Sequence, residues 1–258
     1  MPNQEEKILK LNSLSDLIDV AVHGLRPMYD PEKKRFCYRM RLENDRFIRE
    51  GDSYRYTLIT LLGLSKLHLF CNRDPFGVND LVSAQIENSK YIEYVGDAGL
   101  LIWLTSLTLQ DRIAEVIHRI EPVSLLNRFR DGRTSKTTEL SWLLTGLSYA
   151  KIEARVPMAI VDQLALETYD KIKRNYGGKG IFRHEGTRTL TGKIRGHIGT
   201  FADQVYPIYA LSVYSRVYGD EEASNMAKAC ADAICCNQGD MGQWWWYYNA
   251  DTGTVAGY

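Results

Sequence analysis

The stretch Phe201–Leu211, FADQVYPIYAL, places a carboxylate, an amide and two phenols at the start of an apolar run. Pro207 stands early in that run, where a helix tolerates a missing N–H best. Polar residues also open three other apolar runs, which follow Ser53–Thr57, Gly96-Asp97 and Thr137–Glu139. A polar group followed by an apolar helix, repeated along the chain, predicts a set of helices whose polar ends meet at one mouth.

The composition is that of an ordinary globular protein. Of 258 residues, 45% are hydrophobic and 25% are charged, which is enough for a sizeable core. Lysine plus arginine number 32 and the acids number 32, so no net field attracts nucleic acid or an anionic membrane. No apolar run reaches the ~20 residues of a spanning helix, and the N-terminus lacks the pattern of a signal peptide. Five irregularly spaced cysteines do not form a disulfide framework, which favours a cytoplasmic protein.

Hydrophobic periodicity predicts a mainly helical chain. The predicted helices cover residues 14–25, 54–70, 79–87, 97–109, 111–120, 137–151, 157–176, 201–218 and 220–236. The only predicted strand region is 35–50, which alternates weakly around Glu43-Asn44-Asp45 and indicates a small β-hairpin or an extended loop.

Apolar helices alternate with amphipathic ones along the chain. The helices at 54–70, 97–109, 137–151 and 201–218 are apolar on nearly all sides, which is typical of buried helices. Tyr54 and Asp97 are 43 positions apart, and Asp97 and Glu139 are 42 apart, a spacing that fits a helical-hairpin repeat.

This layout resembles the (α/α) toroid folds, in which inner helices form a barrel and outer helices wrap it. Six-hairpin glycosidases and lyases, terpenoid cyclases and lanthionine cyclases share that architecture. The resemblance implies one all-α (α/α) toroid domain over residues 1–258. It offers four clear inner helices, or five with residues 14–25, so we expect the toroid to be incomplete at the C-terminus. Trp103 and Trp142 are expected to fill space between the inner and outer helices.

Three acids stand at predicted starts of inner helices and are our candidate catalytic residues: Asp97, Glu139 and Asp203. In a toroid those starts converge, and glycoside hydrolysis needs one protonated and one ionised carboxyl. Asp203 is the foremost candidate, because aromatic and amide side chains crowd it. The alternative is that each acid only caps its helix, since Asp and Glu are favoured at helix N-termini.

Candidate binding residues surround these acids. The chain has 16 tyrosines and five tryptophans, whose flat faces suit sugar rings. The loop 177–200 is rich in glycine and basic residues and can hold a carboxylate or phosphate, although a solvated lid without a ligand explains it equally well. Together, the predicted substrate-binding residues are Arg55, Tyr56, Trp142, Arg183, Arg195, Gln204, Tyr206, Trp244, Trp245 and Trp246.

Other motifs argue against two of the toroid families. Gln238, Gly242 and Trp244 match the terpenoid cyclases' Q-x-x-x-G-x-W repeat only once, and no D-x-D-D or D-D-x-x-D motif occurs. Asn237, not histidine, follows Cys235-Cys236, so the zinc ligands of a lanthionine cyclase are not matched. We expect no metal and no cofactor.

The sequence thus predicts a carbohydrate-active enzyme of glycoside hydrolase or lyase type. Its expected partner is a small-molecule or oligosaccharide ligand, an acidic or modified sugar held in a central cavity. The alternative is a non-catalytic toroid that binds a ligand or a partner protein, and the third hypothesis is a terpenoid cyclase-like enzyme.

Overall fold

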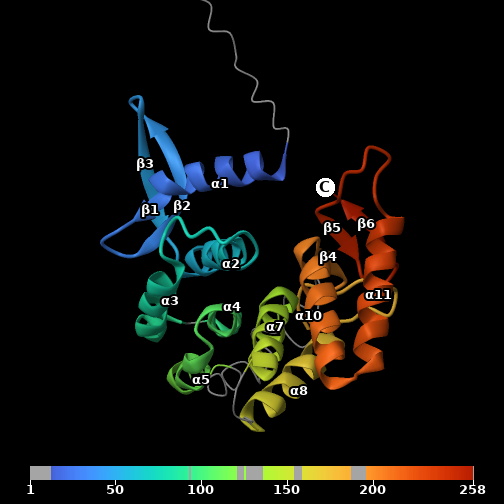
Figure 1. The fold of residues 1–258 in the computed structure, drawn as a ribbon. Coiled ribbons are helices and arrows are strands. Elements are labelled where there is room, and N and C mark those ends of the chain that lie inside the picture. Colours follow the sequence, from blue (N-terminus) through green and yellow to red (C-terminus); the bar gives the residue numbers. More distant parts are fainter. Residues whose placement is uncertain are drawn as a thin grey trace, which may run out of the picture.

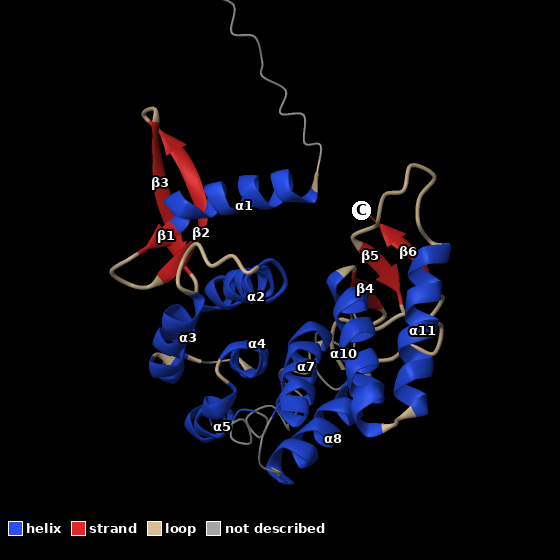
Figure 2. Ribbon diagram, in the orientation of Figure 1, coloured by secondary structure: helices blue, strands red, loops and turns tan. Residues whose placement is uncertain are grey.

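The computed structural model describes residues 13–92, 94–120, 125, 136–153, 159–186 and 196–257. The chain is predominantly helical, with two small antiparallel sheets (Figures 1 and 2). Each predicted helix is present, with its ends shifted by a few residues. The helices are α1 (Leu14–Met28), α2 (Tyr54–Cys71), α3 (Val78–Glu87), α4 (Val95–Thr108), α5 (Ile113–Ile120), α7 (Thr137–Glu153), α8 (Ala159–Arg174), α10 (Ala202–Tyr218) and α11 (Glu221–Cys236), with short 3-10 turns η1 (Ser89–Tyr91) and η2 (Gln110–Arg112).

An inner row of helices runs through the molecule in the order α2, α4, α7 and α10, and each helix contacts the next. Each inner helix also contacts the outer helix that follows it in the chain, α3, α5, α8 or α11. Figure 1 shows the row as an arc with the outer helices on its convex side; within the described residues the arc does not close into a ring. The burial of α4 and α7 on nearly every side follows from this position, because partners pack on both flanks and on the convex face.

Two glycines allow α4 and α7 to pack closely. A Cβ atom on Gly99 would lie 2.3 Å from the Leu143 Cα, and one on Gly146 would lie 2.2 Å from the Gly99 carbonyl oxygen. Only glycine leaves room for such a close backbone approach. The starts of α4 and α7 therefore lie side by side, together with the acids that they carry.

The first sheet confirms the predicted hairpin. It contains β1 (Tyr29–Asp30), β2 (Arg35–Glu43) and β3 (Arg46–Asp52), in the order β1-β2-β3. Asn44 and Asp45 form the turn with φ angles of 48° and 57°, a left-handed conformation that Asn and Asp tolerate best. The buried Phe36 donates its backbone N–H to Thr57 Oγ1 at 3.1 Å, which fixes the sheet to the start of α2.

The second sheet corrects the expectation that residues 35–50 are the only strand region. It contains β4 (Ile198–Thr200), β5 (Tyr247–Asn249) and β6 (Thr254–Gly257), in that order. These strands are too short to show an alternating pattern, and β4 pairs with a segment far along the chain. The side chain of Tyr248, in β5, is fully buried and packs with Ile181 and Ile234. No helix in the described part of the chain is long and apolar enough to cross a membrane.

Candidate functional site

The N-terminal ends of α2, α4 and α7 meet at the guanidinium group of Arg55. Its Nε lies 2.6 Å from Asp97 Oδ1, and its Nη2 lies 2.7 Å from Glu139 Oε1. The second oxygen of Glu139 accepts the Gly96 backbone N–H at 2.8 Å. Two of the predicted catalytic acids are therefore close together, and both bind the same cation.

Aromatic rings enclose that ion pair. The Arg55 guanidinium lies 5.3 Å from the Tyr94 ring centroid and 5.2 Å from that of Trp142, within the range of a cation–π contact. We call Arg55, Tyr94, Asp97, Glu139 and Trp142 the Arg55 cluster. Burial lowers the pKa of Arg55, but its bonds to Asp97 and Glu139 outweigh burial and raise it overall. Arg55 is therefore held by two carboxyl groups in a partly buried assembly and is not a free cation.

Two predicted phenols stand beside this cluster. Tyr206 meets the Trp142 ring edge-on at 5.1 Å. Burial raises the pKa of Tyr206, and the neighbouring Tyr56 phenol adds to the rise. Both rings are only partly open to solvent, since Tyr206 is 37% exposed and Tyr56 is 51% exposed. The structure thus brings Arg55, Tyr56, Trp142 and Tyr206 together, although they come from three separate helices.

The geometry shows how accessible the Asp97 and Glu139 carboxyls are. Their side chains are only 9% and 10% exposed, and both are held by the Arg55 guanidinium. A glycosidase pair needs one protonated carboxyl and one that reaches the sugar or a water. The Arg55 cluster does not offer that arrangement.

Asp203, at the start of α10, is completely buried. Its Oδ2 accepts hydrogen bonds from the Thr200 backbone N–H at 2.8 Å, from Thr200 Oγ1 at 2.7 Å and from His184 Nδ1 at 2.9 Å. Its Oδ1 accepts from Thr138 Oγ1 at 2.9 Å. Burial raises the pKa of Asp203, but His184 and Thr200 outweigh burial and lower it overall. Asp203 is therefore an ionised group that holds His184 in place.

His184 is the exposed member of this Asp203–His184 pair. Its side chain is 42% exposed, whereas that of Asp203 is 0% exposed. The hydrogen bond to Asp203 raises the pKa of His184, against the opposing effects of burial and of the Lys136 charge. Because Nδ1 faces Asp203, Nε2 is the nitrogen available to a ligand, and no described residue hydrogen-bonds to it. An imidazole oriented in this way by a carboxylate is suited to proton transfer.

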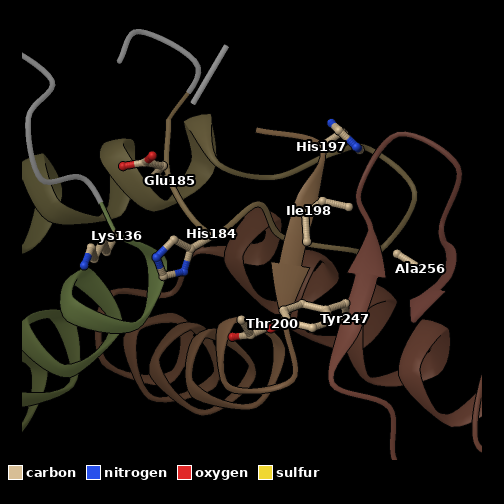
Figure 3. Close-up of a pocket in the computed structure, with 8 residues that line it drawn as sticks. All are labelled: Lys136, His184, Glu185, His197, Ile198, Thr200, Tyr247 and Ala256. Atoms are coloured by element: carbon tan, nitrogen blue, oxygen red, sulfur yellow. The ribbon is translucent and has the colours of Figure 1, made fainter. Parts of the chain in front are cut away.

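A cavity of about 740 Å³ adjoins this pair (Figure 3). Figure 3 shows the His184 ring between Lys136 and Thr200, with Tyr247 beside Thr200. The lining residues come from the start of α7, the segment after α8 and all three strands of the second sheet: Lys136, His184, Glu185, His197, Ile198, Thr200, Tyr247 and Ala256. Lys136 gives this lining one positive charge, which can pair with an anionic group of a ligand, and Glu185 gives it one negative charge.

Two other predicted binding residues have structural partners. The Gln204 amide accepts the Phe182 backbone N–H at 2.7 Å and donates to the carbonyl oxygens of Phe182 and Thr200. Arg183 binds Asp251 at 2.7 Å and the Tyr176 carbonyl oxygen at 3.2 Å. Neither side chain lines the cavity. The predicted Arg195 lies outside the described residues.

The three consecutive tryptophans lie near the cavity but do not line it. Trp244 stacks on Phe201 at 5.4 Å, Trp245 donates its ring N–H to the Asn237 carbonyl oxygen, and Trp246 is 69% exposed. The next residue, Tyr247, is the aromatic side chain that lines the cavity. Gln238 bonds to the Gly242 carbonyl oxygen, so the single Q-x-x-x-G-x-W match closes a local loop after α11.

The expectation for Trp103 and Trp142 requires a correction. The Trp103 ring contacts Tyr149 and Tyr209, and the Trp142 ring contacts Arg55 and Tyr206. All of these partners belong to inner-row helices. Both tryptophans therefore pack among the inner-row helices rather than between inner and outer helices, and Trp142 is buried there.

None of the eight residues that line the cavity was a predicted site residue, and the three with the most useful chemistry are Lys136, His184 and Tyr247. His184 appeared only as one basic residue of the loop 177–200, and its 19-residue separation from Asp203 matches no recognisable motif. The one signal in the sequence that could have indicated Lys136 is its position directly before the start of an inner helix. Comparison with known proteins adds no further assignment, since no protein-family model and no curated protein matches the chain. Within the described residues, no group of three or more His, Cys, Asp or Glu side chains can hold a metal ion.

Proposed function

We propose that this chain is a carbohydrate-active enzyme of lyase type that acts on an acidic sugar, built on part of an (α/α) toroid. The observation that carries the proposal is the Asp203–His184 pair, which presents an oriented imidazole to a cavity that also contains Lys136. The arc of alternating inner and outer helices supports the toroid.

The chemistry that fits these groups is β-elimination from a uronic acid unit. His184 Nε2 takes the proton from the carbon next to the carboxylate, and Lys136 pairs with that carboxylate as charge develops on it. The electron pair of the broken C–H bond forms a carbon–carbon double bond as the bond to the leaving sugar oxygen breaks. Tyr247, in the same cavity, supplies a proton to that oxygen. Atoms and charges balance without water or another reactant.

The same observations favour elimination over hydrolysis. Hydrolysis needs two working carboxyls, whereas Asp97 and Glu139 share Arg55 and Asp203 is buried behind His184. Elimination needs one base, one cation and one proton donor, and the described cavity contains all three. The engagement of every predicted acid also supports the second candidate function, a non-catalytic toroid that binds an acidic ligand in this cavity.

The test compares His184→Gln with the wild type on a panel of uronate polysaccharides. The ultraviolet absorbance of the unsaturated product reports elimination. Loss of a general base is expected to reduce kcat by about 10²- to 10⁴-fold. The exposed His118→Gln on α5 serves as a matched control and should retain full activity, and circular dichroism checks the folding of both variants.

The pH profile gives a second readout. Because the His184 pKa is raised, the neutral imidazole that acts as a base becomes abundant only as pH rises through that pKa, and kcat/KM should rise over the same range. Full turnover by His184→Gln overturns the proposal. Acidic-sugar binding that depends on His184, with no turnover by the wild type, supports the non-catalytic alternative instead.

A further inference from the structure

A row of aromatic side chains continues from the Asp203–His184 pair along the inner surface of the arc. One turn beyond the Thr138–Asp203 contact, Trp142 of α7 meets Tyr206 of α10. Farther along, Trp103 of α4 stacks on Tyr149 and meets Tyr209 in a tilted contact, both at centroid distances of 5.5 Å. We call these five rings, Trp103, Trp142, Tyr149, Tyr206 and Tyr209, the aromatic ladder.

The ladder combines flat apolar faces with polar edges. The Tyr149 and Tyr209 hydroxyls lie 2.8 Å apart and form one hydrogen bond, which leaves further lone pairs for a ligand. Tyr206 and Tyr209 are exposed, whereas Trp142 is only 7% exposed, so the tyrosine rings form the accessible part of the ladder. Aromatic faces bordered by hydroxyl groups suit sugar rings, which carry C–H faces and a rim of hydroxyls.

Two cations flank the far end of the ladder. The Lys66 ammonium of α2 lies 5.5 Å from the Trp103 ring centroid, and Arg216 lies about two turns after Tyr209 on α10. No ion-pair partner for either cation occurs among the residues that the structure describes. Such a position complements a ligand that carries a second negative charge, beyond the one bound at Lys136.

The ladder is longer than one sugar ring. Trp142 and Tyr149 are seven positions apart on α7, which at 1.5 Å per residue is about 10 Å along the helix axis. Thr138, which binds Asp203, is one turn before Trp142 on the same helix. A ligand in the His184 cavity and one on the ladder are therefore close enough to be parts of one molecule.

We propose that the aromatic ladder binds further units of an acidic oligosaccharide, with a carboxylate of the distal part held by Lys66 and Arg216. This inference rests on the proposed function, because it takes the His184 cavity as the place of the reacting unit. It names the substrate class as a polyanionic chain of several uronate units rather than a single acidic sugar.

Isothermal titration calorimetry tests this proposal by measuring binding affinities. The ligands are galacturonate and mannuronate, each as monomer and tetramer, and maltotetraose as a neutral tetramer. For one of the uronates the wild type is expected to bind the tetramer at least about tenfold more tightly than the monomer, and to bind maltotetraose weakly. The double variant Lys66→Gln/Arg216→Gln should weaken tetramer binding by about tenfold, as expected for two exposed ion pairs. Monomer binding should stay unchanged.

The double variant Arg119→Gln/Lys228→Gln is the matched control. It removes the same charge from the outer helices α5 and α11 and should leave both affinities unchanged. Equal binding of monomer and tetramer, or full tetramer binding by Lys66→Gln/Arg216→Gln, overturns the ladder proposal. The two proposals fail separately: His184→Gln should lose turnover and keep the preference for the tetramer, whereas the ladder variant should keep the pH profile of turnover.

Discussion

The Arg55 cluster and the Asp203–His184 pair use similar residues and reach opposite results. In each, a buried acid at the start of an inner-row helix pairs with a basic side chain from another segment. In the Arg55 cluster, two acids and two aromatic rings surround the guanidinium. In the Asp203–His184 pair, the His184 imidazole remains accessible from the cavity.

The difference shows that a buried acid at a helix start can have either of two roles, and that the exposure of its partner decides between them. Asp97 and Glu139 hold Arg55 and so join α2, α4 and α7. Asp203 instead orients an imidazole that a ligand can reach. We therefore expect changes in the Arg55 cluster to alter mainly stability, and changes in the Asp203–His184 pair to alter mainly the titration of His184 and turnover.

The largest effect on stability is expected from Arg55→Met. It leaves Asp97 and Glu139 close together without a countercharge, and breaking a buried ion pair in this way typically costs about 3–5 kcal/mol. Because Arg55 is 28% exposed and water can reach the gap, we expect about 3 kcal/mol from urea unfolding. The exposed Arg39→Met, which breaks a pair with Glu50 in the hairpin, is the control and should have little effect. Equal losses in the two variants would contradict the role of the Arg55 cluster.

A smaller change in stability is expected from Asp203→Asn. The amide oxygen can still accept from His184 and Thr200, and the amide nitrogen can donate to Thr138, so the free energy of unfolding should fall by about 1–2 kcal/mol. The lost negative charge should lower the His184 pKa toward its ordinary value of 6.5. An NMR titration of the His184 ring measures this shift, with Asp162→Asn on α8 as the control. An unchanged His184 pKa would show that Asp203 does not control the titration of His184.

The smallest effect concerns pH. The folded-state pKa of His184 is raised, so protonated His184 stabilises the protein below pH 6.5, and this contribution disappears as pH rises through the folded pKa. Wild type should therefore exceed His184→Gln in stability by more at pH 5.5 than at pH 8.5. Because His184 is partly exposed, we expect a difference below about 1 kcal/mol. The Asp203 pKa is lowered, so its own contribution is lost only below its ordinary value of 3.8. A stability difference between the wild type and His184→Gln that grows with rising pH would contradict the pairing of His184 with Asp203.

The sequence by itself determined the helices and the hairpin. Helix formation follows from local periodicity, which is why α4 and α7 begin close to the predicted positions and why Asp97 and Glu139 stand in their first turns. The alternation of apolar and amphipathic helices also indicated which helices form the inner row, but only α4 and α7 are covered on nearly all sides. The predicted burial of the other two was wrong, because α2 and α10 keep exposed apolar side chains such as Phe70 and Val205. From these facts the meeting of Arg55, Trp142 and Tyr206 could be predicted.

Only the tertiary structure decided which charged groups a ligand can reach. Asp203 and Asp97 have the same local setting in sequence, but the position of β4 and the segment before it buries Asp203 behind His184. The second sheet, which joins residues 198–200 to residues 247–257, likewise exists only through pairing between distant segments. The exposure of a side chain depends on what folds over it, and hydrophobic periodicity, being local, does not contain that information.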